Sequence, residues 1–243
     1  MPDADLAIVV ITCAAAFTQG VSGFGFGLVA VPILLGIVGP SVVTPLVALC
    51  TLTINSLLWI YYRRSFDGAV VGKLLAGAVV GIPLGFWVLQ YVPAAGILTA
   101  LGLMIVAYSL YSLTKPKMPV LKSPYWIYLT GFLSGTLMGS YNLPGPPVIL
   151  YGDSQSWPQK AFKGNLTGFF WSNGVLAVVG HSLQQRITEA LFHQYLSILP
   201  GIIIGLFAGV ALSSVFNPMV FRSVVLFILI GIGVRLFIVG IQT

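Results

Sequence analysis

Two stretches of the sequence place glycines, prolines and neutral hydrogen-bond donors inside strongly apolar surroundings. The first is residues 18–32, TQGVSGFGFGLVAVP, and the second is residues 133–151, LSGTLMGSYNLPGPPVILY. Proline removes a backbone donor and clashes with the preceding turn, so the second stretch cannot form an uninterrupted helix. A broken helix exposes backbone N–H groups and a partial positive charge at each new N-terminus. The chemistry that such a stretch can do is the binding of a small oxyanion, which glycine allows to approach the backbone closely.

The side chains expected around these breaks are small or neutral rather than charged. Lys163 is the basic residue expected near the mouth of the site, and anchoring at the cytoplasmic surface is its alternative role. For each polar residue the alternative is a local hydrogen bond within or between helices. The candidate substrate-binding residues are Gln19, Ser22, Gly23, Phe24, Gly25, Gly27, Asn55, Ser140, Tyr141, Asn142, Pro144, Gly145, Lys163, Thr167 and Asn173.

The composition is that of a protein embedded in a membrane almost throughout. Of the 243 residues, 58% are hydrophobic and 7% are charged, whereas soluble proteins carry about 25% charged residues. The eleven basic residues are spread along the loops and form no stripe of the kind that binds nucleic acid. No phosphate-binding loop, paired carboxylates or metal-spaced cluster is present in the sequence, so no enzyme activity, cofactor or metal site is predicted.

The ionisable residues fit an anion carrier better than a cation carrier. None of the five carboxylates falls in the middle of an apolar run, whereas cation and proton carriers usually keep an ionisable group in the membrane interior. His181 and His193 lie near the ends of predicted spans, where a histidine with satisfied hydrogen bonds at the interface is expected. The sequence therefore shows no proton relay.

Apolar runs of spanning length follow each broken stretch in a repeated order. The expected spans are residues 42–62, 69–91 and 95–113 in the first half and residues 160–180, 190–215 and 219–240 in the second. A shift of 115 positions aligns four pairs of the broken stretches: Gly20 with Gly135, Phe26 with Tyr141, Leu28 with Leu143 and Pro32 with Pro147. Glycines at spacing four recur in two matching spans, as Gly77, Gly81 and Gly85 in residues 69–91 and as Gly201, Gly205 and Gly209 in residues 190–215. We assign them to close helix packing.

These repeats predict an all-α, polytopic membrane protein made of two homologous halves of about four spans each. The halves are residues 1–114 and 124–243, joined by a basic linker at residues 115–123 within one integrated transmembrane domain. Two interrupted segments in matching positions are a pointer to the binding site of a transporter. We therefore expect the substrate to bind between the two broken motifs, near the middle of the bilayer.

Two topologies are compatible with each broken stretch, because it either crosses the membrane once or folds back as a re-entrant hairpin. Single crossings give parallel halves, and hairpins give inverted halves. The hairpins place nine of the eleven basic residues on one face and leave Arg186 and Arg235 opposite. Since short loops rich in lysine and arginine stay cytoplasmic, this separation favours inverted repeats that open with re-entrant hairpins.

The two motifs also resemble a known family. The run from Gln19 to Pro32, the run from Gly135 to Pro147 and the Lys160-Ala-Phe-Lys163-Gly-Asn-Leu stretch are similar to the sulfite exporter TauE/SafE family, as are the length and the duplication. The resemblance covers essentially the whole chain. It implies a transporter of sulfite, sulfonates, sulfoacetate or related organosulfur anions in the bacterial inner membrane.

Three classes of function stay open on the residues alone. The first is a secondary transporter for a small anion, the second is an anion channel with the glycine-rich motifs as its filter, and the third is a membrane scaffold that does not transport. The expected partners are a small anionic substrate and the lipid bilayer, with no nucleic acid. The sequence leaves open whether the chain is a homo-oligomer, in which direction it transports and which ion is coupled.

Overall fold

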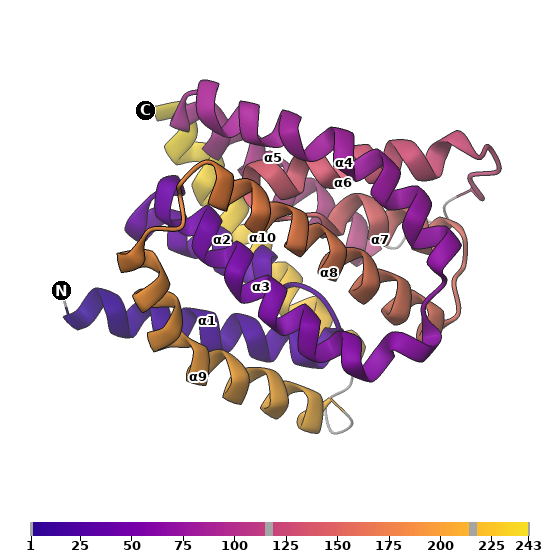
Figure 1. Cartoon of the computed structure of the whole chain (residues 1–243), viewed down its shortest axis with the longest axis horizontal. Coiled ribbons are helices and arrows are strands. Elements are labelled where there is room, and N and C mark those ends of the chain that lie inside the picture. Colours follow the sequence, from indigo (N-terminus) through magenta and orange to yellow (C-terminus); the bar gives the residue numbers. More distant parts are fainter. Residues whose placement is uncertain (1, 115–118, 214–217, 243) are drawn as a thin grey trace. The chain divides into compact units, whose positions relative to one another are not determined.

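The computed structural model describes residues 2–114, 119–213 and 218–242, and these residues form helices joined by short connections (Figure 1). Ten α-helices are found in the described ranges: α1 (Pro2–Ser22), α2 (Phe26–Val38), α3 (Pro40–Tyr62), α4 (Gly68–Tyr91), α5 (Ala94–Thr114), α6 (Tyr125–Tyr141), α7 (Gly145–Ser154), α8 (Gln159–Leu183), α9 (Glu189–Leu212) and α10 (Pro218–Gln242). A short 3₁₀ helix, η1 (Arg63–Ser65), follows α3. The first residue of each predicted span lies within two residues of the first residue of an observed helix, which confirms the all-α prediction.

Five of these helices are long and apolar enough to cross a membrane by length and composition. They are Pro40–Ser65, Gly68–Tyr91, Ala94–Thr114, Glu189–Leu212 and Ser223–Gln242. A helix is suited to the bilayer because all of its interior backbone groups are bonded within the segment. The chain is therefore a polytopic membrane protein. Lys115 and Lys117 of the predicted linker, and Asn217 before the last span, lie outside the described residues.

Both broken stretches are interrupted where the sequence predicts. The chain leaves α1 at Ser22 and enters α2 at Phe26, and it leaves α6 at Tyr141 and enters α7 at Gly145. The second stretch folds back, because the Gln155 side-chain nitrogen after α7 donates to the Leu121 carbonyl before α6 over 3.1 Å. The start and the end of this α6–α7 element therefore lie beside each other.

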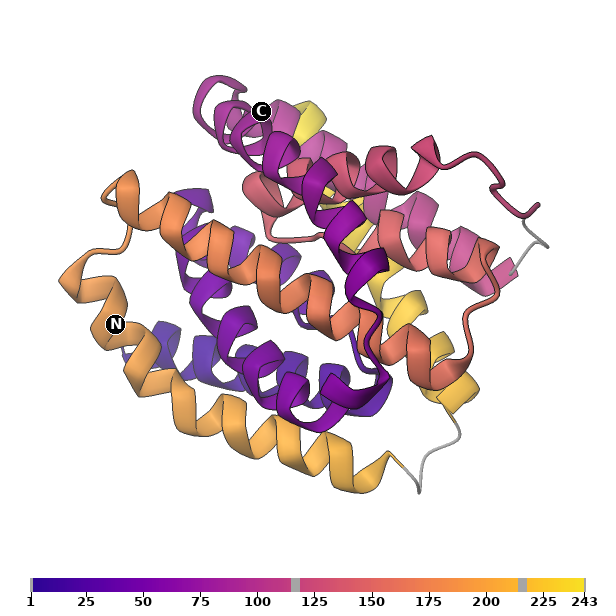
Figure 2. The same cartoon turned by 45° about the vertical axis from the view of Figure 1, so that its right-hand side comes forward.

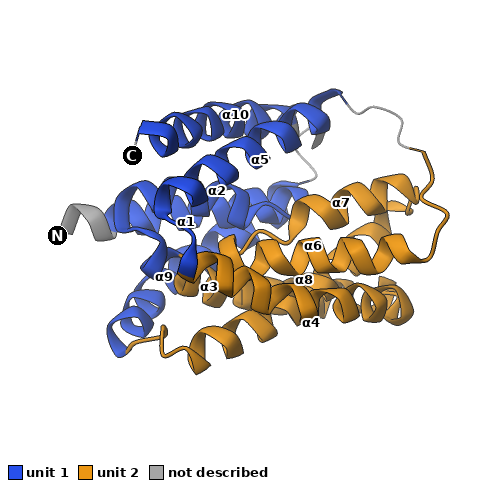
Figure 3. Ribbon diagram, turned by 90° about the horizontal axis from the view of Figure 1, so that it is seen from above, with its two compact units in different colours: residues 1–43, 91–116, 189–243 blue, residues 44–90, 117–188 orange. Residues whose placement is uncertain are grey.

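The described helices divide into two compact units that each combine elements of both sequence halves (Figure 3). Unit 1 consists of Met1–Val43, Tyr91–Pro116 and Glu189–Thr243, and thus contains α1, α2, α5, α9 and α10. Unit 2 consists of Thr44–Gln90 and Lys117–Thr188, and contains nearly all of α3 with α4, α6, α7 and α8. The broken element of each half thus packs with helices of the other half.

In unit 2 the glycine ladder of α4 lies directly on the backbone of α6. A Cβ atom at Gly81 would collide with the Phe132 carbonyl oxygen and lie 2.8 Å from the Thr136 nitrogen. Gly85 would bring a Cβ within 2.8 Å of the Gly139 Cα, so each helix presents glycine to the other. This confirms that the ladder is a packing surface, since glycine lets two backbones approach closely.

In unit 1 the glycine ladder of α9 lies on α1 in the same way, and the two helices run side by side in Figures 1 and 2. A Cβ at Gly205 would collide with the Cys13 carbonyl oxygen, and one at Gly209 would lie 3.1 Å from the Gly20 Cα. Gly201 has ordinary contacts, with the Val9 side chain at 3.4 Å.

These contacts correct the alignment of the two broken stretches. Gly20 faces Gly209 as Gly139 faces Gly85, so Gly20 corresponds to Gly139 and not to Gly135. The helix ends agree, because Ser22 matches Tyr141 and Phe26 matches Gly145 at the same shift of 119 positions. The shift of 115 positions was wrong because it paired identical or similar residues, whereas the structurally equivalent residues of the two breaks are 119 positions apart.

Candidate functional site

The break in unit 1 is built on two glycines with left-handed backbone angles. Gly23 has φ 85° and Gly25 has φ 112°, values that L-residues with a side chain rarely adopt. The Gln19 side chain crosses the break, and its Oε1 accepts a hydrogen bond from the Phe26 backbone nitrogen over 3.0 Å. Gln19 thus caps α2 and holds the two helix ends together, which is a structural task within the site.

The first turn of α2 keeps backbone donors that Gln19 does not use. The first backbone bond of the helix runs from the Val29 nitrogen to the Gly25 carbonyl over 3.1 Å. The amides of Gly27 and Leu28 therefore have no acceptor within the helix, as is usual for the first residues of a helix. Together with the partial positive charge of the helix N-terminus, they suit a small anion.

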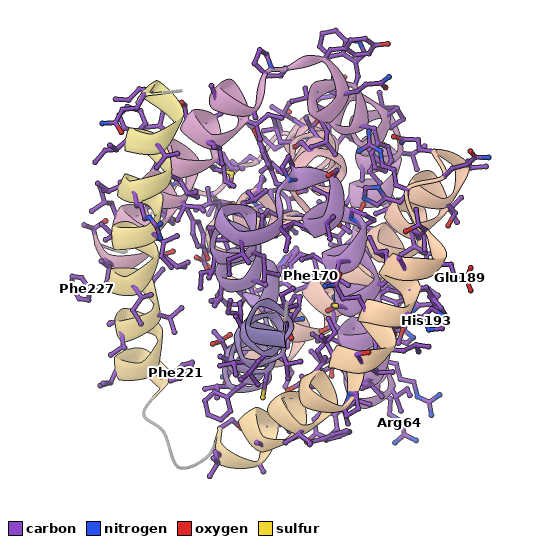
Figure 4. The ribbon with its side chains drawn as sticks, turned by 90° about the vertical axis from the view of Figure 1, so that its left-hand side faces the viewer. Arg64, Phe170, Glu189, His193, Phe221 and Phe227 are labelled. Carbon is purple, nitrogen blue, oxygen red and sulfur yellow. The ribbon has the colours of Figure 1, made fainter. Side chains whose placement is uncertain are left out.

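A pocket borders this break inside unit 1. It measures about 350 Å³ including the part that opens to the surroundings. Ser22, Phe24 and Gly25 of the predicted site are among the residues that line it. Its walls are apolar almost throughout and include Phe221, which lies near the start of α10 (Figure 4). The lining residues are Thr18, Ser22, Phe24, Gly25, Leu28, Tyr108, Phe221, Val225, Leu226 and Leu229.

The Ser22 hydroxyl is engaged within the break itself. It donates to the Thr18 carbonyl over 2.7 Å and also contacts the Phe24 carbonyl, and its oxygen lies 3.4 Å from the Phe24 nitrogen. Ser22 therefore shapes the break rather than presenting a spare donor to the pocket. Sequence reasoning missed the pocket wall from α5 and α10, because apolar residues of a membrane helix carry no signal for a pocket.

The break in unit 2 uses asparagine where the first break uses glycine. Asn142 follows α6 with φ 55° and ψ 37°, and its backbone nitrogen donates to the Met138 carbonyl over 3.0 Å. Its side-chain nitrogen donates to the Thr44 carbonyl over 2.5 Å. The Asn142 Oδ1 is buried and has no hydrogen-bond partner in the described part of the chain. This oxygen is thus a free hydrogen-bond acceptor, and its donor would have to come from outside the described residues.

The N-terminus of α7 offers fewer donors than that of α2. Pro144 occupies the N-cap position and Gly145 the first helical position. Pro146 and Pro147 come next and have no N–H, so Gly145 supplies the remaining amide at this end. The sequence-based expectation that both breaks expose several amides therefore holds better for α2 than for α7.

Asn173 on α8 is the predicted site residue with the most unusual surroundings. Its side chain is fully buried, and neither its Nδ2 nor its Oδ1 has a partner among the described residues. Thr167, two turns earlier, is also buried. Buried amides are normally hydrogen-bonded, so Asn173 fits a group that meets a ligand or water.

Several other predicted residues make local bonds instead. The Asn55 side-chain nitrogen donates to the Thr51 carbonyl over 2.8 Å, and the Ser140 hydroxyl donates to the Thr136 carbonyl over 2.8 Å. Tyr141 is buried beside Ser140 at the end of α6. Lys163 lies over the Tyr62 ring at 5.7 Å from its centroid, close to the end of α3.

The Gly164-Asn165 pair of the family-like stretch holds a turn. The Asn165 Oδ1 accepts from the Asp67 backbone nitrogen over 2.8 Å, and a Cβ at Gly164 would collide with the Ser65 carbonyl oxygen. This pair fixes the connection between α3 and α4 against α8, and we assign it no contact with the substrate.

Comparison with known proteins agrees with this architecture. The family model described as "Sulfite exporter TauE/SafE" matches residues 8–236. A protein of Cupriavidus necator described as "Probable sulfite/organosulfonate exporter TauE" is 25% identical over 236 residues, which cover 94% of this chain and 92% of that protein. No solved structure gives a significant match. The chain therefore belongs to the sulfite exporter TauE/SafE family and is a membrane transporter rather than an enzyme.

Proposed function

We propose that this protein is a secondary transporter that carries a small sulfur-containing oxyanion, such as sulfite or an organosulfonate, across the bacterial inner membrane. The family, and the description of the Cupriavidus necator relative as a probable sulfite/organosulfonate exporter, support the substrate class. The anion binds at the broken helices, and the direction of transport in this proposal is export.

The observation that carries the proposal is the first turn of α2. The Gly27 and Leu28 amides have no acceptor within the helix, and Leu28 also lines the pocket beside the break. A helix N-terminus next to a pocket attracts an anion without a charged side chain, so the anion also leaves readily. A carrier needs both properties because it must release its substrate on the far side of the membrane.

A second part of the proposal rests on the sequence. The second broken motif also binds the anion, as its repetition of the first motif suggests. Asn173 supplies a polar side chain for the anion, since its buried Nδ2 is a hydrogen-bond donor without a partner among the described residues.

Isothermal titration of the purified protein with sulfite, sulfate, sulfoacetate, thiosulfate, taurine and a panel of carboxylates tests the substrate class. We expect a sulfur oxyanion to bind more tightly than any carboxylate. Tight binding of a carboxylate with no sulfur anion bound would contradict the proposal.

The variant Gly27→Pro tests the site on α2, because it removes one of the two amides and leaves the helix intact. Proline is tolerated in the first turn of a helix, and α7 carries Pro146 at the matching position. Loss of a hydrogen bond to a charged group, about 1.5–3 kcal/mol, predicts a roughly 10- to 150-fold weaker affinity. Gly36→Ala on the same helix is the control, since a Cβ there meets no atom within 4 Å. Unchanged affinity in a folded Gly27→Pro protein would place the anion elsewhere.

A further inference from the structure

His181 differs from the interface histidine that the sequence predicts. It lies in α8 with its side chain fully buried, and neither ring nitrogen has a hydrogen-bond partner among the residues that the structure describes. His193 in α9 is the opposite case, because its side chain is 71% exposed and lies 3.7 Å from Glu189 on the outside of the helix (Figure 4). A buried imidazole without partners is unusual, since buried polar groups are nearly always bonded.

His181 shares one face of α8 with Asn173, the other side chain of this helix whose polar atoms lack partners. The two residues are eight positions apart with Ala177 between them, and residues four apart lie on one helix face. Ala177 is buried in one core cluster with Met138 of α6 and Phe86 of α4. Asn173 lies about one helical turn before Ala177, and His181 lies about one turn after it. The two polar side chains therefore lie on either side of this cluster.

The facing stripe of α6 repeats the same order. Ser134 and Asn142 lie four positions before and after Met138, and the Ser134 Oγ and the Asn142 Oδ1 are also buried without partners in the described ranges. Four side chains with unsatisfied polar atoms thus surround one apolar cluster within unit 2. Polar groups in a membrane interior mark the paths of substrates, ions or protons.

The contacts of His181 place it next to the second break. Its ring packs edge-on against Phe86 with 4.9 Å between the ring centroids. The backbone nitrogen of Phe86 lies 3.0 Å from where a Cβ at Gly139 would be, and Gly139 is three residues before Asn142. One side chain thus separates the imidazole from the end of α6.

The charged surroundings of His181 are simple. Arg186, just after α8, is the charged group that acts on the imidazole, and its positive charge disfavours a proton there. Its backbone nitrogen donates to the His181 carbonyl over 2.9 Å. From α4 the imidazole meets Phe86, and the nearby core residues from α3, α6 and α8 are Ala48, Met138 and Ala177, which do not titrate. No carboxylate of the described chain pairs with His181, so a positive imidazolium there has no protein counter-ion.

We propose that His181 binds the proton that accompanies the transported anion. The step forms one N–H bond on the imidazole, and the proton comes from the aqueous solution. A bound oxyanion supplies the negative partner that the protein lacks, and the anion and imidazolium together carry less net charge than the anion alone. Binding of the anion and binding of the proton therefore strengthen each other by the same factor. This inference rests on the proposed function.

The test uses the whole protein in lipid nanodiscs with ¹⁵N-labelled histidine. The chain has two histidines, so His193→Gln leaves a single imidazole signal and assigns it to His181. The probe is sulfate, which stays doubly charged throughout the titration of a histidine. We expect saturating anion to move the titration midpoint of His181 upward by about one pH unit, equal to tenfold linkage, while His193 in the unsubstituted protein stays unchanged.

Proton uptake in weakly buffered solution gives a second reading. At a pH halfway between the two midpoints, the unsubstituted protein and His193→Gln should each take up about half a proton per anion bound, as a one-unit shift allows. His181→Gln should bind the anion without proton uptake. Anion binding with no change in the His181 signal, or equal proton uptake by His181→Gln, would overturn the inference and leave the proposed function intact. Absence of binding by every anion tested would overturn both.

Discussion

Three buried asparagines of unit 2 illustrate how one residue type serves different tasks. Asn165 accepts a hydrogen bond from the Asp67 backbone and holds the α3–α4 connection. Asn142 uses its nitrogen to bind the Thr44 carbonyl and leaves its oxygen unpaired, while both polar atoms of Asn173 are unpaired in the described structure. An unpaired buried amide destabilises the fold, so its retention indicates a partner outside the chain.

This difference predicts opposite effects for two matched substitutions. Asn173→Leu removes an unsatisfied polar group, so the melting temperature should stay the same or rise while oxyanion affinity falls about two- to tenfold. Asn165→Leu leaves the Asp67 nitrogen without its partner and should lower stability by about 1–3 kcal/mol with unchanged affinity. Thermal unfolding and titration of both variants check the pair. A stability loss in Asn173→Leu equal to that in Asn165→Leu would make Asn173 a structural residue.

At the scale of the elements, the glycines fall into two groups according to what surrounds them. Gly81 of α4 has the backbone of α6 where a side chain would be, whereas Gly145 has the Ile149 and Phe170 side chains at 3.5 and 3.8 Å from a Cβ. Gly25 belongs to neither group, because its φ of 112° strains any residue with a side chain. Gly25→Val would therefore disturb the fold of the break itself, and Gly145 is the better position for testing the site.

We expect Gly81→Ala to force α4 and α6 apart and to destabilise the protein by about 1–3 kcal/mol, which is typical of overpacking. Gly145→Ala should leave the melting temperature unchanged, because its contacts are of ordinary length. Thermal unfolding with size-exclusion chromatography checks both variants. Equal melting temperatures for the two variants would mean that the close α4–α6 contact is absent.

The fold-back of the α6–α7 element predicts a cross-link between its two ends. In a background with Cys13 and Cys50 replaced by alanine, cysteines at Leu121 and Gln155 should join through a short bifunctional reagent, since these residues are hydrogen-bonded. An impermeant thiol reagent should also reach both positions from the same side of the membrane. A single crossing of the bilayer would put them on opposite sides, so labelling from opposite sides would rule out the hairpin.

Much of the helical pattern can be predicted from the sequence, and the details of the breaks cannot. Hydrophobic runs and prolines fix where α3, α4 and α6 begin and end, because membrane helices have few other options. The two breaks differ in sequence at their left-handed residue, which is Gly23 in the first break and Asn142 in the second. Asparagine can adopt this conformation in place of glycine, so a comparison of residue identities does not pair the two positions. Identity-based alignment therefore chose the wrong partner for Gly20.

The missed parts of the candidate site share a physical cause. Phe221 and Leu229 are typical membrane-helix residues, and their position beside Gly25 depends on contacts between elements distant in sequence. His181 was expected at the membrane interface because it lies near the end of a span, yet its burial follows from the packing of Phe86 against it. Neither contact can be recognised from the residues that neighbour it in the sequence.

At the scale of the whole molecule, the two compact units each take helices from both sequence halves. The broken element of one half packs on the glycine ladder of the other, as α1 does on α9 and α6 does on α4. Such an exchange makes each half depend on the other for its close packing. We therefore expect that neither residues 1–114 nor residues 124–243 expressed alone gives a monodisperse protein, whereas co-expression of the two restores it, as size-exclusion chromatography would show.

The central claim, that the protein is a carrier for a sulfur oxyanion, is tested most directly by counterflow. Proteoliposomes loaded with unlabelled sulfite are diluted into a trace of ³⁵S-labelled sulfite, and the label inside the vesicles is followed with time. A carrier should concentrate the label transiently above its equilibrium level, with a rate that saturates with sulfite, and Gly27→Pro should require a higher sulfite concentration for the same rate. Entry of label no faster than into protein-free vesicles, or a flux that grows linearly with concentration and shows no counterflow, would contradict the account.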